Sequence, residues 1–297
     1  MNFKSIVNSI KNKNFLRKVK NKIYANIGKF ELSKNRIIIN KANQDKCLRR
    51  YRKNFRYVID NFKYDSSIKQ QKSKIIWCFW YQGLDNAPDI VKKCIESQKK
   101  YALGYDLKII TNDNINDYIE LPDYILKKFE RGIISLTHFS DIIRISLLAE
   151  YGGIWLDSTV FLTDYLPDYI TNNKLFVFKN IELDRSDESP VVASSWLISS
   201  FSNQKIILLT RDLLFEYWKK KNKLDDYFTF HIFFKIVTDF FEKEWENVPT
   251  YSNINPHILF FEYLREFNED RFNDIKKISS IHKLDRRAKN EDKRKIY

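Results

Sequence analysis

The amino-acid sequence predicts an α/β fold in which helices flank a mostly parallel β-sheet. Two observations carry this prediction. Over residues 75–157, short apolar runs of strand length alternate with longer runs whose apolar residues recur at helical spacing, an order typical of a parallel sheet. Glycine and proline are scarce, at 6 each among 297 residues, and hydrophobic residues make up 43%. This composition excludes collagen-like, linker-rich and mainly disordered chains.

The first three expected elements are a strand, a helix and a second strand. Residues 75–81 form a continuous apolar run that ends at the Gln-Gly pair 82–83, as expected for a buried strand. The segment 86–88, Asn-Ala-Pro, begins a helix with apolar residues on one face. Residues 106–110 form the second strand, which ends at the Thr-Asn pair 111–112.

The next two expected elements are a nearly all-apolar helix and a short strand. The helix covers residues 135–150 and is stopped by Gly152 and Gly153. The strand covers residues 154–156 and ends at Asp157. Ligands of parallel α/β sheets bind at the carboxyl ends of the strands. The polar residues after the three strands are therefore the first place to look for a site.

The net charge of +14 is unevenly distributed. Residues 1–74 carry a balance of +17 and residues 276–297 a balance of +6, whereas residues 75–275 carry −9. A protein that binds nucleic acid through its main fold usually carries its positive charge on that fold. We therefore expect no nucleic-acid partner for the acidic body.

A basic, mainly helical N-terminal extension is expected over residues 1–72. Within residues 1–30 an apolar stripe at helical spacing faces a lysine-rich side, so this segment either lies on an anionic membrane surface or packs on the body with its basic face solvated. No apolar run approaches the roughly 18 residues of a transmembrane helix. We expect no signal peptide, and three cysteines fit a reducing compartment. The expected location is the cytoplasm, or the inner face of the cell membrane as a peripheral protein.

Several catalytic chemistries lack their sequence motifs. The chain has no glycine-rich phosphate loop, no His-Glu-x-x-His motif, no Cys/His cluster for zinc and no Gly-x-Ser-x-Gly elbow. Attention therefore turns to the strand ends and the apolar helix before the last of them.

The segment 138–159 carries the most informative polar residues. Asp141 and Arg144 lie three positions apart on the apolar helix, so their side chains share a face. A helix this apolar is buried, and buried charges need partners. Two interpretations stay open from the residues alone. The acid and base form a self-contained ion pair, or they are presented with Asp157 to a polar ligand.

The same segment resembles the nucleotide-sugar site of GT-A glycosyltransferases. The resemblance rests on Ser-Asp-x-x-Arg at 140–144 and Tyr-Gly-Gly-Ile-Trp-Leu-Asp at 151–157, and the opening strand 76–83, Ile-Trp-x-x-Trp-x-x-Gly, is similar as well. The relatives it indicates are glycosyltransferase family 32, the glucosylating clostridial toxins and bacterial capsular polysaccharide synthesis proteins. The order and spacing match from about residue 74 to 165, with a looser match beyond.

The resemblance implies a fold, a domain layout and an activity. The fold is GT-A, a Rossmann-like α/β arrangement, over residues 73–285, followed by a basic tail at 286–297. The activity is transfer of a sugar from a nucleotide diphosphate sugar, with UDP as the expected nucleotide, to a growing surface glycan. Retention of anomeric configuration is implied, and no dedicated general base is then required.

Roles for single residues also follow from the resemblance. Trp80 would lie against the nucleotide base, whose flat face suits an aromatic partner, and Asn112 would hydrogen-bond the base or ribose. Three residues, Asp141, Arg144 and Asp157, are the expected catalytic set. The expected donor-binding set is Trp80, Gln82, Gly83, Asn112, Ser140, Asp141, Arg144, Trp155 and Asp157.

The chain departs from the family pattern at the Asp-x-Asp motif, which here is Asp157-Ser158-Thr159. Mn²⁺ and Mg²⁺ prefer carboxylate oxygens, and a threonine hydroxyl is a weaker, neutral ligand. Either Asp157 and Thr159 hold a divalent metal with help from elsewhere, or the site needs none. Without a metal, positive side chains must meet the charge of the leaving diphosphate. The candidates for that role are His282, Lys283, Arg286 and Arg287.

Two further expectations concern the acceptor and the alternative functions. Asp226 and His231 are candidates to face the acceptor, although the aromatic spacing around them also fits a core helix.

One alternative function is a non-catalytic GT-A-like scaffold in a polysaccharide assembly complex, which the replaced second aspartate favours. The other is a basic nucleic-acid-binding protein that uses the two charged ends.

Overall fold

The computed structural model describes residues 32–180 and 189–286. The amphipathic segment predicted at 1–30 and nearly all of the basic tail lie outside these residues. The chain divides into two compact units, Met1–Lys46 and Cys47–Tyr297. Helix α3 (Leu32–Asn54) begins in the first unit and continues into the second. The sheet and the candidate site belong to the second unit.

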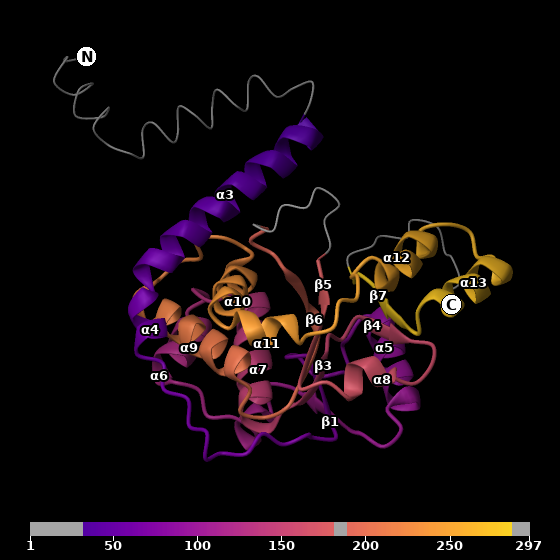
Figure 1. The fold of residues 1–297 in the computed structure, drawn as a ribbon. Coiled ribbons are helices and arrows are strands. Elements are labelled where there is room, and N and C mark those ends of the chain that lie inside the picture. Colours follow the sequence, from indigo (N-terminus) through magenta and orange to yellow (C-terminus); the bar gives the residue numbers. More distant parts are fainter. Residues whose placement is uncertain (1–31, 181–188, 287–297) are drawn as a thin grey trace. The chain divides into compact units, whose positions relative to one another are not determined.

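Helices and strands follow α3 along the chain (Figure 1). In chain order they are α4 (Arg56–Asp60), β1 (Ile75–Phe79), α5 (Asp89–Tyr101), β2 (Asp106–Ile110), η1 (Ile115–Asp117), α6 (Asp123–Glu130), α7 (Leu136–Tyr151), β3 (Gly153–Leu156), β4 (Val160–Leu162), α8 (Asp168–Thr171), β5 (Leu175–Lys179), β6 (Ala193–Ser200), α9 (Lys205–Lys220), α10 (Thr229–Phe240), α11 (Glu242–Glu246), η2 (Asn255–His257), α12 (Ile258–Tyr263), α13 (Glu269–Ile278) and β7 (Ile281–Lys283). Helical segments and single strands alternate from α4 to β3, whereas β3 and β4, β5 and β6, and the helices from α9 to α13 follow one another directly.

The central sheet of the described residues has five strands in the order β2-β1-β3-β6-β5. Strand β1 pairs in parallel with both β2 and β3, whereas β6 is antiparallel to β3 and to β5. Strands β2, β1, β3 and β5 therefore run the same way, and β6 runs against them. The prediction of an α/β fold with a mostly parallel sheet flanked by helices is confirmed.

The predicted strands and helices are found close to their expected bounds. Strand β1 ends two residues before the end of the apolar run 75–81, and β2 has the predicted bounds. The backbone N–H of Trp80 still donates to the carbonyl of Ile110 at 2.9 Å. Helix α7 begins after Ser135, whose hydroxyl accepts the N–H of His138 at 3.4 Å and caps the helix.

Helices cover both faces of the sheet (Figure 1). Successive side chains of each strand point to opposite faces, so each strand contributes to the packing on both. Trp77 and Trp155 point into the main core, which α7, α9 and α10 complete. The intervening Cys78 points to the opposite face, where it packs against Val91 of α5 and Leu259 of α12. Both faces are thus buried, which explains why the strands are continuously apolar.

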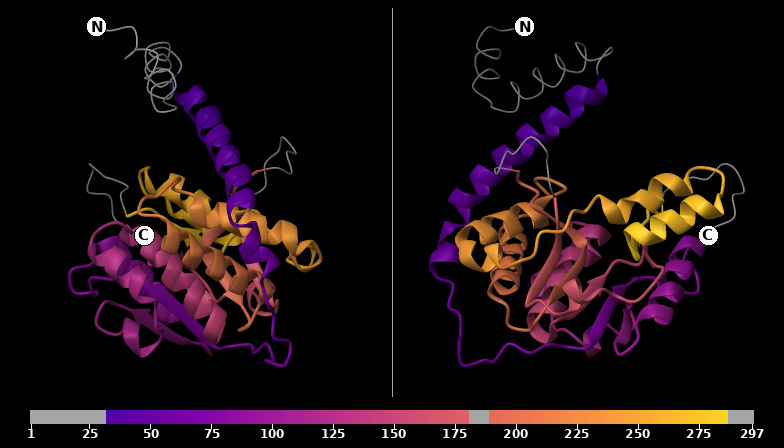
Figure 2. Two further views of the ribbon diagram at one scale, coloured as in Figure 1. Left: turned by 90° about the vertical axis from the view of Figure 1, so that its left-hand side faces the viewer. Right: turned by 45° about the vertical axis from the view of Figure 1, so that its right-hand side comes forward.

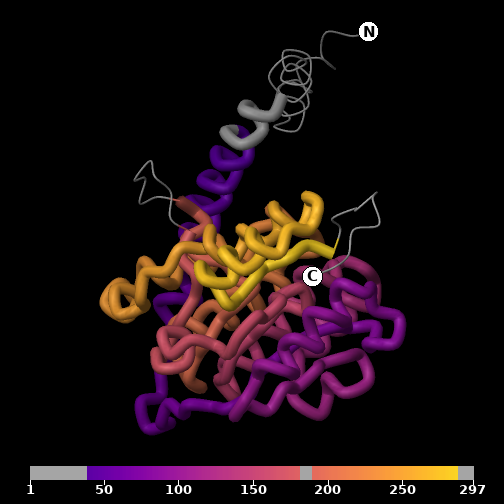
Figure 3. The backbone as a smooth tube through the Cα atoms, turned by 90° about the vertical axis from the view of Figure 1, so that its right-hand side faces the viewer, coloured from indigo at the N-terminus to yellow at the C-terminus, as the bar shows by residue number. Residues whose placement is uncertain are grey.

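A second, two-stranded sheet brings the C-terminal segment back to the end of β3. Strand β7 pairs antiparallel with β4, and the N–H of Leu284 donates to the carbonyl of Thr159 at 2.9 Å. Figures 2 and 3 show the segment in yellow that contains α12, α13 and β7 running alongside α5 in purple. Residues more than 100 positions apart in the chain thereby meet beside Asp157.

The Gly-Gly pair between α7 and β3 allows a close approach of three backbone segments. Gly152 and Gly153 have φ values of +65° and +98°, which side chains of L-residues rarely adopt. A Cβ on Gly152 would lie 2.4 Å from the backbone nitrogen of Ser202, and one on Gly153 would lie 2.5 Å from the carbonyl oxygen of Ile75. The pair is therefore required where α7 turns directly into β3.

Replacing Gly152 by alanine is expected to lower the free energy of unfolding by about 3 kcal/mol, because backbone strain and overlap with fixed backbone act together. Gly132→Ala is the matched control. Gly132 has a similar φ of +69°, but a Cβ added there would meet nothing within 4 Å. Its substitution should cost about 1 kcal/mol from strain alone. Urea unfolding of both variants measures the difference, and equal losses would contradict the close approach at Gly152.

None of the helices in the described part of the chain combines the length and the apolar character needed to cross a membrane.

Candidate active site

Asp157 lies directly after β3 and its backbone is held on three sides. Its N–H donates to the carbonyl of Trp196 at 2.9 Å. Its own carbonyl accepts the N–H of Val160 at 2.9 Å and the side-chain amide of Gln98 at 3.0 Å. The buried strand and these bonds fix the position of the carboxylate, which is 27% exposed at the carboxyl edge of the sheet.

The Asp157 carboxylate is surrounded by donors and positive charge. One oxygen, Oδ1, accepts hydrogen bonds from the Arg144 guanidinium at 3.0 Å and from the Trp155 indole at 2.9 Å. The other, Oδ2, lies 3.9 Å from the ammonium of Lys283. Charge-assisted hydrogen bonds of this kind are short and strong, and they fix the orientation of the carboxylate. Oδ2 is the oxygen left for a ligand.

Arg144 joins the two acidic residues that the sequence singled out. Its guanidinium donates to Asp141 on one side and to Asp157 on the other. It also stacks on the rings of Trp155 and Phe230, at 4.8 and 5.7 Å from their centroids. The ion pair that the sequence left open is therefore formed, but it is part of a larger cluster that reaches the strand end. We call Asp141, Arg144, Trp155 and Asp157 the acidic cluster.

Burial shifts the pKa values of Asp141 and of the neighbouring His138. Burial raises the pKa of Asp141 above its ordinary value, and the charges of Arg144 and His138 oppose that shift. Burial likewise lowers the pKa of His138, whose Nδ1 lies 3.6 Å from an Asp141 oxygen. Neither ring nitrogen of His138 has a hydrogen-bond partner among the described residues. His138 is 2% exposed, so its ring is enclosed within the fold beside Asp141.

Sequence reasoning did not single out His138 as a site residue. The spacing could have indicated it, because His138 precedes Asp141 by three positions on the same helix. Ser140, which the resemblance placed at the donor, lies half-buried on the same helix. Gln98 was also missed, since its role depends on α5 packing against the end of β3.

Lys283 occupies the position beside the residue that replaces the second aspartate. Its ammonium donates to the Thr159 hydroxyl at 2.7 Å and to the carbonyl of Leu284 at 2.9 Å. The described residues contain no group of three or more His, Cys, Asp or Glu side chains that could hold a metal. Asp157 and Thr159 offer one carboxylate and one hydroxyl, both beside a cation. This donor set does not by itself fit a resident Mg²⁺ or Mn²⁺.

His282 is placed away from the acidic cluster, although it is the neighbour of Lys283. Successive residues of a strand point to opposite faces, so the two side chains diverge. His282 is fully buried and its Nε2 lies 3.1 Å from the hydroxyl of Thr163. Burial lowers its pKa to about 4, so the ring is neutral at pH 7. Of the described candidates for the diphosphate, Lys283 lies beside Asp157, His282 points away, and Arg286 lies over the Trp80 ring.

The predicted base-binding residues lie at the ends of β1 and β2. The N–H of Asn112 donates to the carbonyl of Tyr81 at 2.9 Å, which joins the two strand ends, and Gln82 and Asn112 are exposed. Gly83, at φ +76°, forms the turn after Trp80. The half-buried Trp80 packs in the cluster that also contains Leu284, the residue after Lys283, and Arg286 lies 5.7 Å from its ring centroid.

Asp226 and His231 lie on the α10 side of the acidic cluster. The Asp226 carboxylate accepts the N–H of Phe228 at 2.8 Å and acts electrostatically on His138. His231 is half-buried in the first turns of α10. Burial, with the positive charge of Arg144 next in size, lowers its pKa to about 3. A neutral imidazole near the cluster can accept or donate a hydrogen bond but adds no charge.

The chain matches a family model described as "Capsular polysaccharide synthesis protein" over residues 28–297. It is 29% identical over 109 residues to O-glycosyltransferase braB from Annulohypoxylon truncatum, a match that covers 33% of this chain and 26% of that protein. It is 24% identical over 169 residues to O-glycosyltransferase PaGT from Phomopsis amygdali, which covers 51% and 40%. The matched part is thus about a quarter to two fifths of the length of these relatives.

Among solved structures, similar chains include the PaToxG glycosyltransferase, at 15% identity and a TM-score of 0.40, over 70% of this chain and 83% of that one. A second is a transferase mutant with two Cys-to-Ser changes, at 11% identity and a TM-score of 0.36, over 64% and 98%. A third is the bacterial N-acetylglucosamine transferase NleB, at 12% identity and a TM-score of 0.30, over 72% and 97%.

Proposed function

This chain belongs to the family of capsular polysaccharide synthesis proteins, and from that premise we propose that it is a glycosyltransferase. It moves a sugar from a UDP-linked donor to a growing surface glycan with retention of anomeric configuration. The observation that carries the proposal is the acidic cluster at the carboxyl edge of the sheet, where Arg144 links Asp141 to Asp157. Strand ends of parallel sheets are the usual place for such a ligand.

The proposed reaction exchanges one bond at the anomeric carbon for another. The bond from that carbon to the diphosphate oxygen breaks through an oxocarbenium-like state, and a bond to the acceptor oxygen forms. The bonding electrons leave with UDP, and the proton of the acceptor hydroxyl passes to the departing diphosphate. The protein must therefore stabilise the charge of the leaving group and position the acceptor.

Each part of the site has a role in this scheme. Lys283 supplies positive charge to the leaving diphosphate, and Asp157 and Asp141 bind hydroxyl groups of the donor. Trp80, beside the strand ends and with Arg286 over its ring, binds the base. The half-buried His231 is on the acceptor side. Arg144 holds both carboxylates, since its guanidinium is almost fully covered by them and by two aromatic rings.

The cellular setting is part of the same proposal. A lipid-linked or surface glycan acceptor places the enzyme at the inner face of the cell membrane. The basic segment 1–30 is proposed to contact that surface through its lysines and its apolar stripe. Removing residues 1–30 would then weaken binding to anionic vesicles and leave nucleotide binding unchanged.

Nucleotide binding tests the proposal directly. Calorimetry with UDP, GDP and CMP, each with Mn²⁺ and with EDTA, is expected to show the tightest binding for UDP. Because Lys283 lies where a metal would otherwise act, EDTA should leave UDP binding within about threefold. Lys283→Met should weaken it about tenfold or more, as expected for loss of a charged hydrogen bond. Lys99→Met, on the exposed side of α5, is the control and should have no effect.

Two results would change the interpretation. No binding of any nucleotide would overturn the transferase proposal. Binding that EDTA abolishes would assign the diphosphate to a metal at Asp157 and take that role from Lys283.

A second candidate is a non-catalytic scaffold with a GT-A-like fold. The observation that favours it is Thr159 in place of an acid, with its hydroxyl already bonded to Lys283. The two candidates differ in turnover. The scaffold binds UDP but releases none from a panel of UDP-glucose, UDP-galactose and UDP-N-acetylglucosamine in the presence of acceptor glycans.

A further inference from the structure

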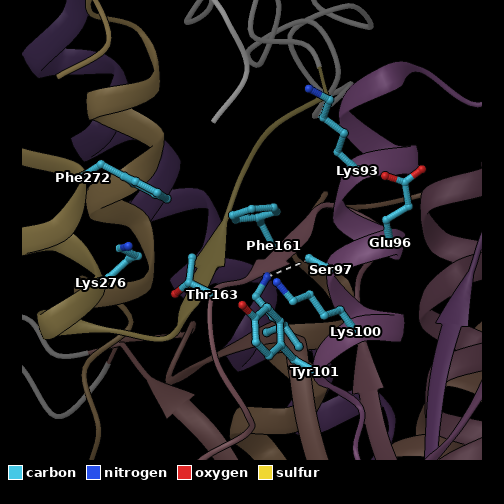
Figure 4. Close-up of a pocket in the computed structure, with 10 residues that line it drawn as sticks. Lys93, Glu96, Ser97, Lys100, Tyr101, Phe161, Thr163, Phe272 and Lys276 are labelled. Carbon is cyan, nitrogen blue, oxygen red and sulfur yellow. Dashed lines mark hydrogen bonds between the residues drawn. The ribbon is translucent and has the colours of Figure 1, made fainter. Parts of the chain in front are cut away.

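A separate pocket of about 460 Å³ lies between α5, β4 and α13 (Figure 4). Helix α5 forms one wall and α13 the opposite wall, with Phe161 of β4 between them. Neither Asp157 nor any other member of the acidic cluster lines it. The lining residues are Lys93, Glu96, Ser97, Lys100, Tyr101, Phe161, Leu162, Thr163, Phe272 and Lys276.

The charge of the pocket is mainly positive. Three lysines line it, Lys93 and Lys100 on α5 and Lys276 on α13, against the single carboxylate of Glu96. Within residues 32–180 and 189–286, no carboxylate forms an ion pair with any of these three lysines. Lys93 and Lys100 belong to the segment 75–275, whose overall balance is negative, and Lys276 is the first residue of the basic C-terminal segment. Such a pocket attracts an anion.

Aromatic rings provide the remaining walls. Tyr101, Phe161 and Phe272 contribute their side chains to the lining. The ammonium groups of Lys100 and Lys276 lie over the rings of Tyr101 and Phe272, each at 4.9 Å from the centroid. Each such pair offers a cation beside an apolar ring face. A sugar ring has apolar C–H faces that pack on aromatic rings, so an anionic sugar matches both features, whereas a simple inorganic anion matches only the lysines.

The pocket is connected to the candidate active site through two short paths. Phe161 lies four residues after Asp157, and Ser97 precedes Gln98, whose amide holds the Asp157 carbonyl. The second path runs through β7. The hydroxyl of the pocket residue Thr163, just after β4, lies 3.1 Å from Nε2 of His282, the neighbour of Lys283 on β7. A ligand in the pocket would therefore lie near the site but outside it.

We propose that this pocket binds an anionic sugar unit of the acceptor glycan, carrying a carboxylate or a phosphate. The proposal rests on the function proposed above and adds to it the class of acceptor. The pocket would bind a sugar unit that is already part of the glycan. The end of the glycan would then reach the donor in the candidate active site. The three lysines bind the anion and the aromatic rings bind the faces of the sugar.

Binding of matched oligosaccharides to the full chain tests the proposal. The probes are a tetramer of galacturonic acid, a tetramer of galactose and inorganic phosphate at equal ionic strength, with glucose 6-phosphate as the phosphorylated sugar. The galacturonate tetramer or glucose 6-phosphate is expected to bind at least about tenfold tighter than the neutral tetramer and phosphate. Which of the two anionic sugars binds distinguishes a carboxylate from a phosphate.

Substitutions localise the binding. Lys93→Gln and Lys276→Gln lie on opposite walls, and each should weaken binding of the preferred anionic sugar about tenfold or more, a loss typical of one charged hydrogen bond. Lys99→Gln, which is exposed on α5 but does not line the pocket, removes the same charge and should leave affinity unchanged. Phe161→Leu should weaken binding of the sugar and leave binding of phosphate alone unchanged.

The outcomes separate this proposal from the function on which it rests, because UDP binding is measured on every variant. UDP binding without a preference for anionic sugars would overturn the pocket proposal alone. Equal binding of inorganic phosphate and the anionic sugars would also overturn it, by showing a plain anion site. Binding of the anionic sugar that the wall lysines control, in a chain that binds no nucleotide, would support the pocket and overturn the transferase.

Discussion

Asp157→Asn is expected to reduce sugar transfer about 100- to 1000-fold while the protein stays folded. The change keeps the shape of the side chain but removes its charge at the one partly exposed carboxylate of the acidic cluster. Preorganised charges of this kind contribute on this scale when they act on the transition state. The measurement is UDP release from a panel of UDP-sugars with glycan acceptors, together with the urea unfolding midpoint. Asp141→Asn is expected to act in the same direction.

The control for this experiment is Asp85→Asn. Asp85 is exposed in the loop after β1, so its substitution removes one negative charge without touching the acidic cluster. It should leave turnover within about twofold, as is usual for an exposed charge. Wild-type activity in Asp157→Asn would refute the assignment of this site.

Replacing Arg144 by methionine is expected to lower the free energy of unfolding by about 3–5 kcal/mol. Methionine can still pack between Trp155 and Phe230, but Asp141 then keeps a buried charge without its partner. Breaking a buried ion pair from one side carries a cost of this order. Urea unfolding measures it, and Arg131→Met on an exposed turn is the control, expected within about 0.5 kcal/mol.

A double-mutant cycle separates charge from packing. In the presence of Arg144, Asp141→Asn is expected to destabilise the protein, because it removes one side of the ion pair. In Arg144→Met, the same Asp141→Asn change should stabilise the protein, because it removes an unpaired buried charge. Additive effects in the two backgrounds would show that the pair is not energetically coupled, contrary to the geometry.

Most of the local structure could be predicted from the sequence. Periodicity and capping residues are local features, and they predicted an apolar strand at 75–81, of which 75–79 forms β1, the strand at 106–110 and the helix that begins after Ser135. The same local spacing put Asp141 and Arg144 on one helix face, and the Gly-Gly stop put Asp157 at the end of β3. Contacts within about twenty residues of one another are set by helix and strand geometry.

The antiparallel strand β6 was not predicted. Strand β6 lies between β3 and β5. Its own residues do not indicate its partners, because an apolar run of this length can pair parallel or antiparallel to a neighbouring strand. The strand order is instead decided by which arrangement buries both faces of the sheet.

The site shows the same division. The α/β layout follows from the sequence, and so do the shared helix face of Asp141 and Arg144 and the place of Asp157 at the next strand end, because all three residues lie within one helix–strand unit. It is the packing of distant segments that brings Lys283 to Asp157 and Thr159, turns the neighbouring His282 away and places lysines of α5 and α13 around one pocket. These contacts join segments more than 100 residues apart. Their formation depends on how β7 pairs with β4 and how the C-terminal helices pack on α5, and no local periodicity encodes that pairing.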